Sequence, residues 1–437
     1  MDESILIVDD DSGVRDSIGA VLRDEGFRVR YAADGDEALV RAGEERPDLV
    51  LLDVWLPGMD GIQVLEHLRQ GHADLPVIVI SGHGNIETAV RATKLGAIGF
   101  MEKPFSIEGL LEAISGALHR ARPGEAGAAE SDAASGDARF RGSAGSILAG
   151  REVRQRTVAR AVVGAGLGLH SGARTGIILQ PLPPGSGIVF SSVSGAGEVE
   201  ADVGNVESTG YATTLFKKGL AVRTVEHLMA TLHAYGITNL LVKIEGEVPI
   251  LDGSAVELCE LLEQAGIDEQ DATITSIELA DELRMDPAPG QFLSVRPYDG
   301  LRVTYELSYP PPIGDQTYVF TMRDALDFRH EIAPARTFGF VDEIRALESA
   351  GLGQGGQLGN FILIGEQGVV NTTLRFPEEL ARHKILDILG DFYLLGAPLR
   401  AEIHARKTGH SHNVAMVKRI RELMKAGGRY SSPITRG

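Results

Sequence analysis

The segment Ala381–Asp391 reads A-R-H-K-I-L-D-I-L-G-D and predicts a buried helix that carries a polar stripe. His383 and Asp387 are four residues apart, so on a helix their side chains share one face, and Asp391 continues that face. Isoleucine and leucine cover most of the remaining circumference, which indicates burial. Because buried charges without partners are costly, one interpretation is a metal ion opposite this stripe. The alternative is a solvated helix edge with a His–Asp pair.

Length and composition favour a folded protein with several domains. A chain of 437 residues is expected to form about two to four domains. No apolar run approaches the length of a membrane span, and the acidic N-terminus does not resemble a signal peptide. A single cysteine, Cys259, excludes a disulfide framework, so we expect a cytoplasmic location. The formal net charge of −19 argues against a nucleic-acid binder.

The first 120 residues predict an α/β doubly wound fold. Short β-branched runs at Ile5–Val8, Leu49–Leu52 and Val77–Ile80 are typical of buried parallel strands. Helical patterns at Gly13–Glu25 and Asp60–Gln70 alternate with them. In such folds ligands bind at the carboxyl ends of the strands.

Polar side chains gather at those strand ends. Asp9 and Asp10 follow the first strand, Asp53 follows the third, Ser81 follows the fourth, and Lys103 precedes a proline. Three converging carboxylates repel one another unless a hard cation such as Mg²⁺ lies between them. Lys103 would neutralise an incoming phosphoryl group.

This constellation resembles the receiver domain of two-component response regulators, a flavodoxin-like fold, over residues 3–120. The resemblance implies that Asp53 is the phosphoacceptor, that the acidic pair holds Mg²⁺, and that Ser81 and Lys103 contact the phosphoryl group. It places Phe100 at the aromatic switch position and implies a histidine kinase as phosphodonor. The alternative is a receiver fold that no longer accepts phosphate and serves dimerisation or docking.

The composition of the chain suggests five successive parts. The Ala-, Gly- and Ser-rich segment 121–150 cannot bury enough apolar surface to offset its ordering entropy, so we expect a mobile linker. The predicted order is receiver 1–120, this linker, two strand-then-helix halves at 151–273 and 274–425, and a tail at 426–437.

A second helix is predicted at Arg223–Gly236, with Thr224 as its N-cap. Glu226 and His227 fall in its first turn. There the helix dipole favours an ionised carboxylate and a neutral imidazole, the states needed for a general base and a metal ligand.

His227, His383 and Asp387 together would supply three protein ligands and leave a fourth position open, as catalytic zinc sites do. Glu226 would add a base beside the metal. Lys384 and Thr337 could meet negative charge that develops on the substrate, and His410 is a second titratable group. These parts suit metal-assisted hydrolysis of an amide.

A glycine-rich segment at Gly351–Gly359 formally contains G-x-G-x-x-G. It precedes the apolar run Phe361–Ile364 and does not lead from a strand into a helix, which argues against dinucleotide binding. We interpret it as a flexible loop.

Six separated motifs carry a second resemblance. They are G-L-G-L-H-S-G at Gly166–Gly172, T-V-E-H-L at Thr224–Leu228, P-I-L-D-G-S-A at Pro249–Ala255, A-R-T-F-G-F at Ala335–Phe340, R-H-K-I-L-D-I-L-G-D at Arg382–Asp391, and K-T-G-H at Lys407–His410. In this order they resemble the UDP-3-O-acyl-N-acetylglucosamine deacetylases of lipid A biosynthesis, over about residues 152–425. That family is usually a stand-alone enzyme, so the receiver departs from its pattern.

The resemblance implies an α+β fold of two halves, with helices packed between two sheets and inserts that shape a tunnel for the acyl chain. It also implies a set of residue roles: zinc ligands His227, His383 and Asp387; base Glu226; acid His410 oriented by Asp391; oxyanion contact Thr337; and substrate contacts Lys384, His170 and Phe338. The implied substrate is a UDP-linked acylated amino sugar, whose acyl chain allows peripheral contact with a membrane.

Two alternatives belong to other functional classes. A DNA-binding output needs a basic element, but residues 151–437 carry 28 basic and 35 acidic side chains. Only Val417–Lys425 is basic, and we interpret it as a solvated helix face. The other alternative is a catalytically inactive deacetylase-like output used for binding, which the complete set of metal and base residues disfavours.

Overall fold

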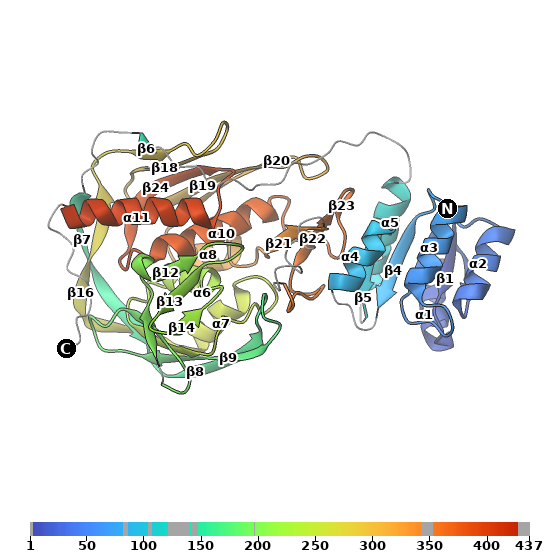
Figure 1. Ribbon diagram of the computed structural model, residues 1–437, viewed down its shortest axis with the longest axis horizontal. Helices are drawn as coiled ribbons and strands as arrows, with labels where there is room; N and C mark the ends of the chain where they lie inside the picture. Colours follow the sequence, from blue (N-terminus) through green and yellow to red (C-terminus); the bar gives the residue numbers. More distant parts are fainter. Residues whose placement is uncertain are drawn as a thin grey trace. The chain divides into compact units, whose positions relative to one another are not determined.

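A computed structural model describes residues 3–81, 86–103, 107–120, 140–141, 147–195, 197–341 and 353–426. The chain divides into two compact units. Unit 1 comprises Met1–Ala128, Phe338–Ala350 and Gly356–Leu374, and unit 2 comprises Ala129–Thr337, Gly351–Gly355 and Arg375–Gly437. Figure 1 labels many of the elements of both units.

Unit 1 contains the predicted doubly wound fold. Its elements are β1 (Ser4–Val8), α1 (Ser12–Asp24), β2 (Arg28–Ala32), α2 (Gly35–Glu44), β3 (Leu49–Asp53), α3 (Gly61–Gly71), β4 (Val77–Ser81), α4 (Ile86–Lys94), β5 (Gly99–Glu102) and α5 (Ile107–Arg120). In the described residues the strands form a parallel sheet in the order β2-β1-β3-β4-β5. The three predicted strands and two predicted helices are confirmed.

A small sheet from the second predicted half of the deacetylase also belongs to unit 1. It contains β21 (Phe338–Phe340), β22 (Ile362–Gly365) and β23 (Gly368–Val369). β21 pairs parallel with β22, and β22 pairs antiparallel with β23. We call residues 338–341 and 356–374 the insert.

Unit 2 is built on two larger sheets. The described strands of one follow the order β11-β10-β15-β9-β8, and those of the other β20-β19-β24-β18-β17-β6, with the long antiparallel pair β7 and β16 joined through β24. Their bounds are β6 (Phe140–Arg141), β7 (Ile147–Val158), β8 (Val162–Leu167), β9 (Arg174–Pro181), β10 (Ile188–Ser191), β11 (Glu198–Glu200), β15 (Leu240–Ile244), β16 (Ile267–Leu279), β17 (Leu283–Met285), β18 (Phe292–Pro297), β19 (Leu301–Ser308), β20 (Asp315–Met322) and β24 (Leu399–Arg406).

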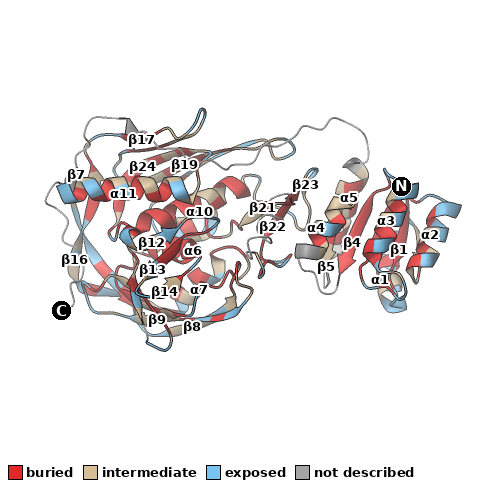
Figure 2. Ribbon diagram, in the orientation of Figure 1, coloured by how far each residue is buried: buried red, intermediate tan, exposed pale blue. Residues whose placement is uncertain are grey.

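The helices of unit 2 lie between these sheets, as expected. Their bounds are α6 (Glu226–Ala234), α7 (Val256–Ala265), α8 (Ala325–Glu331), α10 (Glu379–Tyr393) and α11 (His410–Ala426). α10 packs on β19 and β20 of one sheet and on α6 and α11, while α7 joins α6 to β8 of the other sheet. A short helix η1 (Val203–Asn205) and a small sheet of β12 (Val206–Ser208), β13 (Thr214–Lys217) and β14 (Leu220–Val222) complete the unit. Figure 2 shows that α6 and α10 are almost entirely buried.

Several predictions about individual segments can be compared with the described residues. β7 begins at Ile147, inside the segment expected to be a linker, and 121–139 lie outside the described residues. The prediction that Thr224 caps α6 is wrong, because the helix begins at Glu226 and Thr224 has a φ of +57°. The described part of the glycine-rich segment forms turns, in which the N–H of Gly355 donates to the carbonyl of Leu169. No helix among the described residues is long and apolar enough to cross a membrane.

Candidate metal centre and receiver site

The metal centre forms where α6 and α10 cross. Glu226 and His227 lie in the first turn of α6, and His383 and Asp387 lie on one face of α10. The helices approach so closely that a Cβ atom at Gly390 would lie 2.0 Å from the carbonyl oxygen of Glu226. Glycine at this position therefore permits the approach that brings the two pairs of residues together.

Three potential ligands meet at this crossing. One ligand atom from each of His227, His383 and Asp387 lies within 4.8 Å of the others, and all three residues are buried. The Nε2 atoms of His383 and His227 lie 3.5 Å and 4.0 Å from Oδ1 of Asp387. Two imidazole nitrogens and one carboxylate oxygen are a donor set that fits zinc in a catalytic site.

The electrostatic environment keeps these groups in metal-binding states. Burial and the neighbouring His383 lower the pKa of His227 to about 3, and burial also lowers the pKa of His383. Nδ1 of His383 lies 3.1 Å from the carbonyl oxygen of Ala335, so a proton on Nδ1 leaves the Nε2 lone pair for a metal. Although burial would raise the pKa of Asp387, Lys384 and the nearby histidines hold it below its usual range.

Glu226 has the pKa expected of a general base. Burial raises the pKa of Glu226 to about 7, because the raising effects of burial, Asp391 and Asp387 outweigh the lowering effect of His410. Its Oε2 atom accepts a hydrogen bond of 3.1 Å from the backbone N–H of Thr213. The sequence argument from the helix dipole favoured the ionised form, and burial outweighs that dipole here.

Asp391 is the centre of a buried hydrogen-bond network. Its side chain is fully buried and its Oδ2 atom lies 2.8 Å from Nδ1 of His410. The Thr213 hydroxyl donates to Oδ1 at 2.6 Å, and the Asn413 amide donates to Oδ2 at 2.9 Å. These contacts fix the ring of His410 with Nδ1 toward the carboxylate and Nε2 toward the metal centre.

His410 is positioned to carry a proton. Its Nε2 atom lies 4.0 Å from Oε1 of Glu226 and 3.9 Å from Oδ2 of Asp387. Burial alone would lower the pKa of His410, but Asp391, Asp387 and Glu226 raise it to about 10. An imidazolium therefore lies opposite a carboxylate whose pKa is near neutrality.

The receiver site collects the predicted polar residues. Ligand atoms of Asp9, Asp10 and Asp53 lie within 4.8 Å of one another, a donor set that fits Mg²⁺. Lys103 Nζ lies 2.6 Å from Asp9 and 2.7 Å from Asp53. Burial raises the pKa of Asp9 in spite of Lys103, and the two carboxylates raise the pKa of Lys103 against its burial. Ser81 is buried, and its carbonyl accepts the Lys103 N–H at 2.8 Å.

Comparisons with known proteins cover both parts of the chain. Residues 155–422 match the model of the UDP-3-O-acyl N-acetylglycosamine deacetylase family. The chain belongs to this deacetylase family. Residues 5–115 match the response regulator receiver domain.

Individual proteins are similar to one or the other part of the chain. The UDP-3-O-acyl-N-acetylglucosamine deacetylase of Syntrophotalea carbinolica is 41% identical over 61% of this chain and 88% of its own. That of Thermodesulfovibrio yellowstonii is 35% identical over 61% of this chain and 92% of its own. The crystal structure of the receiver domain of NtrX from Brucella abortus is 46% identical, covering 26% of this chain and 98% of its own, with a TM-score of 0.26.

Two other expected deacetylase residues, Lys384 and Thr337, have contacts close to the ligands in sequence. Lys384 Nζ lies 3.1 Å from Oδ2 of Asp387. Thr337 follows Ala335, the contact of His383, by two residues, and its N–H donates to the carbonyl of Gly253 at 2.8 Å. Between them Arg336 forms a buried ion pair with Glu379 of α10, 2.9 Å between Nε and Oε1.

His170 and Phe338 lie outside the metal triad. The His170 side chain is buried, and neither ring nitrogen has a hydrogen-bond partner within the described residues. Phe338 begins β21, directly after Thr337, and its ring lies 6.4 Å from that of Phe340.

Sequence reasoning missed three residues that support this deacetylase site. Thr213 and Asn413 bind Asp391, and Glu247 accepts hydrogen bonds from the backbone of His170 and from the Thr224 hydroxyl at 2.8 and 3.0 Å. Asn413 lies three residues after His410 on α11, a spacing that could have indicated it. Thr213 and Glu247 carry no such local signal.

Proposed function

We propose that unit 2 hydrolyses the N-acetyl group of UDP-3-O-acyl-N-acetylglucosamine to UDP-3-O-acyl-glucosamine and acetate, a step of lipid A biosynthesis. The observation that carries this proposal is the meeting of three kinds of group in one buried site. They are a two-histidine, one-aspartate donor set, a carboxyl group with a pKa of about 7, and an imidazole with a pKa of about 10. Family membership supports the choice of substrate.

His227, His383 and Asp387 would hold Zn²⁺. A bound Zn²⁺ would polarise the acetyl carbonyl and make water more acidic at neutral pH. The neutral state of both imidazoles and the ionised state of Asp387 support this assignment.

Proton transfer is assigned to Glu226 and His410. Glu226 accepts a proton from the attacking water, and His410 donates its proton to the amine nitrogen as the carbon–nitrogen bond breaks. Asp391 orients His410 through the 2.8 Å contact. The Thr337 hydroxyl donates a hydrogen bond to the oxyanion, and the Lys384 ammonium supplies positive charge nearby.

Substrate recognition is assigned to three residues outside the metal triad. His170, Phe338 and Lys384 line the substrate site in this proposal, and the acyl chain brings the enzyme close to a membrane surface. A UDP-linked substrate is consistent with a cytoplasmic enzyme, and we propose no nucleic-acid partner for a chain with a net charge of −19.

The receiver part is proposed to accept a phosphoryl group on Asp53 from a histidine kinase. Asp9 and Asp10 would bind Mg²⁺, while Lys103 and Ser81 would contact the phosphoryl oxygens. The ion pairs of Lys103 with both Asp9 and Asp53 support this assignment, because the Lys103 ammonium can also pair with a phosphoryl group on Asp53. We also propose that the domains of the chain meet at residues 120, 150, 273 and 425.

Separating metal binding from proton transfer tests the enzymatic assignment. His383→Ala should lose zinc and activity together, whereas Glu226→Ala should keep zinc and lose ~10²–10⁴-fold in kcat, as for a missing general base. His404→Ala is the matched control, since this histidine of β24 pairs with Glu306 away from the triad and should leave both readouts unchanged. Normal turnover by Glu226→Ala would refute the base assignment. Stoichiometric zinc without any deacetylation by the unaltered protein would favour the inactive, binding-only alternative.

A further inference from the structure

The insert occupies the open edge of the receiver sheet. β5 is an edge strand in the described sheet, so its outer backbone groups have no neighbouring strand within the receiver. The N–H of Phe100 on β5 donates a 3.0 Å hydrogen bond to the carbonyl of Val370, the residue after β23. A segment that lies within the deacetylase family match thus binds the receiver through its backbone.

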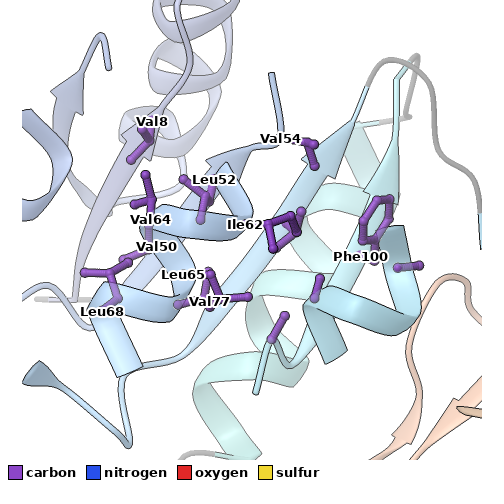
Figure 3. Close-up of a cluster of buried hydrophobic side chains, with 14 of the residues drawn as sticks. Val8, Val50, Leu52, Val54, Ile62, Val64, Leu65, Leu68, Val77 and Phe100 are labelled. Atoms are coloured by element: carbon purple, nitrogen blue, oxygen red, sulfur yellow. The ribbon is translucent and has the colours of Figure 1, made fainter. Parts of the chain in front are cut away.

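Apolar side chains extend this contact into a continuous core. One buried cluster, drawn in part in Figure 3, joins receiver residues with insert residues. The cluster includes Ala89, Ala92 and Phe100 of the receiver together with Val341, Leu358, Phe361 and Leu363 of the insert, and Val370 packs against the cluster. Leu363 is fully buried and Phe100 is 1% exposed. Removing large apolar side chains such as Phe100 and Leu363 from water stabilises the contact.

Hydrogen bonds within the insert hold its segments together. The Asn371 amide donates to the carbonyl oxygens of Phe361 and Leu358 at 2.7 and 2.8 Å, and its oxygen accepts the Leu363 N–H at 2.8 Å. The insert begins directly after Thr337, and the next residue after it is Arg375, which pairs with Asp252 at 2.8 Å. A displacement of the insert therefore moves Phe338, its first residue, which is bonded directly to Thr337.

The receiver element that binds the insert also leads into the phosphoacceptor site. Lys103 follows Phe100 by three residues and pairs with Asp53 and Asp9. Phosphorylation of Asp53 changes the charge that Lys103 faces, so the ion pairs at the end of β5 change with it. Phe100, whose N–H donates to the carbonyl of Val370 and whose side chain belongs to the same buried cluster as insert residues, lies on this strand.

We propose that the insert is the docking partner of the receiver within this chain, and that phosphorylation of Asp53 weakens the docking. The docking itself is independent of the proposed function, while its control through Asp53 and its effect on substrate binding through Phe338 rest on that function. Coupling of this kind is typically worth about 5–150-fold in an equilibrium constant.

A disulfide trap tests the docking. A Cβ atom at Gly365 would lie 3.3 Å from Cγ2 of Thr93 on α4, which places a cysteine pair within reach of a disulfide. Thr93→Cys with Gly365→Cys should therefore form an intramolecular bond under mild oxidation. The natural Cys259 is buried and should not compete. Gly43→Cys with Gly365→Cys is the control, because Gly43 on α2 has open space around it and should not cross-link.

Adding beryllofluoride with Mg²⁺ tests the effect of phosphorylation. We expect cross-linking to slow by about fivefold or more, and to be unaffected when Asp53→Ala is also present. Hydrogen exchange at the Phe100 amide of the unaltered chain should speed up in parallel, which reads the same event without any substitution. Cross-linked dimers in place of monomers, or an unprotected Phe100 amide, would overturn docking within the chain. An unchanged cross-linking rate and unchanged exchange would overturn phosphorylation control.

Deacetylation in the same samples separates this inference from the proposed function. We expect beryllofluoride to change KM for the acylated sugar nucleotide by at least about fivefold and kcat by less, because Phe338 is assigned to substrate contact. A complete lack of activity would count against the proposed function and leave the cross-linking result to decide the docking. Normal activity with an unmoved KM would refute the effect on substrate binding.

Discussion

Replacing Gly390 by alanine tests whether the close crossing of α6 and α10 sets the geometry of the metal centre. The new methyl group would lie 2.0 Å from the carbonyl oxygen of Glu226 and 2.8 Å from its carbonyl carbon, whereas ordinary contact begins at 3.4 Å. Both obstacles are backbone atoms, so no side-chain rotation relieves the clash. The helices must separate by about 1.4 Å at this point.

Stability and activity should respond very differently. Overpacking of a core lowers the free energy of unfolding by ~1–3 kcal/mol. Alanine forms a helix more readily than glycine, which raises the free energy of unfolding by ~0.5–1 kcal/mol. The net loss of stability is then about 0–2.5 kcal/mol, a small part of what holds the domain together. A displacement of about 1 Å between groups of one active site, however, can cost ~10²-fold in rate. We therefore expect kcat/KM to fall ~10²-fold and zinc to bind more weakly, because His227 moves away from His383 and Asp387.

Zinc content, kcat/KM and thermal unfolding of the same preparation provide the assay. Gly43→Ala is the control, since Gly43 also lies inside a helix but has no atom within 4 Å of the added Cβ. That variant should gain stability from helix propensity and keep full activity. If Gly390→Ala bound zinc normally and lost less than about threefold in kcat/KM, the crossing distance would not be what fixes the ligand geometry.

Further predictions concern pH, buried charge and metal. The rate should have a bell-shaped pH dependence. It falls as pH drops below the pKa of Glu226, which is about 7 before a bound cation lowers it. It also falls as pH rises above the pKa of His410, which is about 10. Asp391→Asn removes the largest charge effect that raises the pKa of His410, so the basic limb should move to lower pH in rate profiles. Glu379→Gln leaves the Arg336 guanidinium buried without its carboxylate and should cost ~3–5 kcal/mol in urea unfolding. Chelation should abolish activity, and Zn²⁺ but not Mg²⁺ should restore it.

Local patterns predicted the parts of the site that lie on single elements. The spacing of His383, Asp387 and Asp391 placed all three on one helix face, because helical periodicity alone decides that. The receiver fold was predicted for the same reason, since alternating strand and helix patterns determine a doubly wound sheet and the edge where its polar residues meet.

What the sequence did not predict depends on contacts between distant segments. The Thr224 hydroxyl seemed suited to cap α6, but Glu247, 23 residues away, accepts it instead. Thr213 lies 178 residues from Asp391 and donates to it at 2.6 Å. The association of the insert with the receiver joins β5 to residues about 270 positions later, and neither segment carries a local pattern that indicates a partner.

The arrangement of charges explains why the pKa of Glu226, the residue that we propose as general base, rises while the pKa of Asp387 falls. Asp387 has the Lys384 ammonium 3.1 Å away, and Asp391 has the ring of His410 at 2.8 Å together with two neutral donors. Glu226 accepts one backbone N–H and has its nearest cationic partner, His410, at 4.0 Å. With less compensation for the same burial, its pKa rises to about 7 while the pKa of Asp387 falls. A cation placed closer to Glu226 should therefore lower its proton affinity and weaken it as a base.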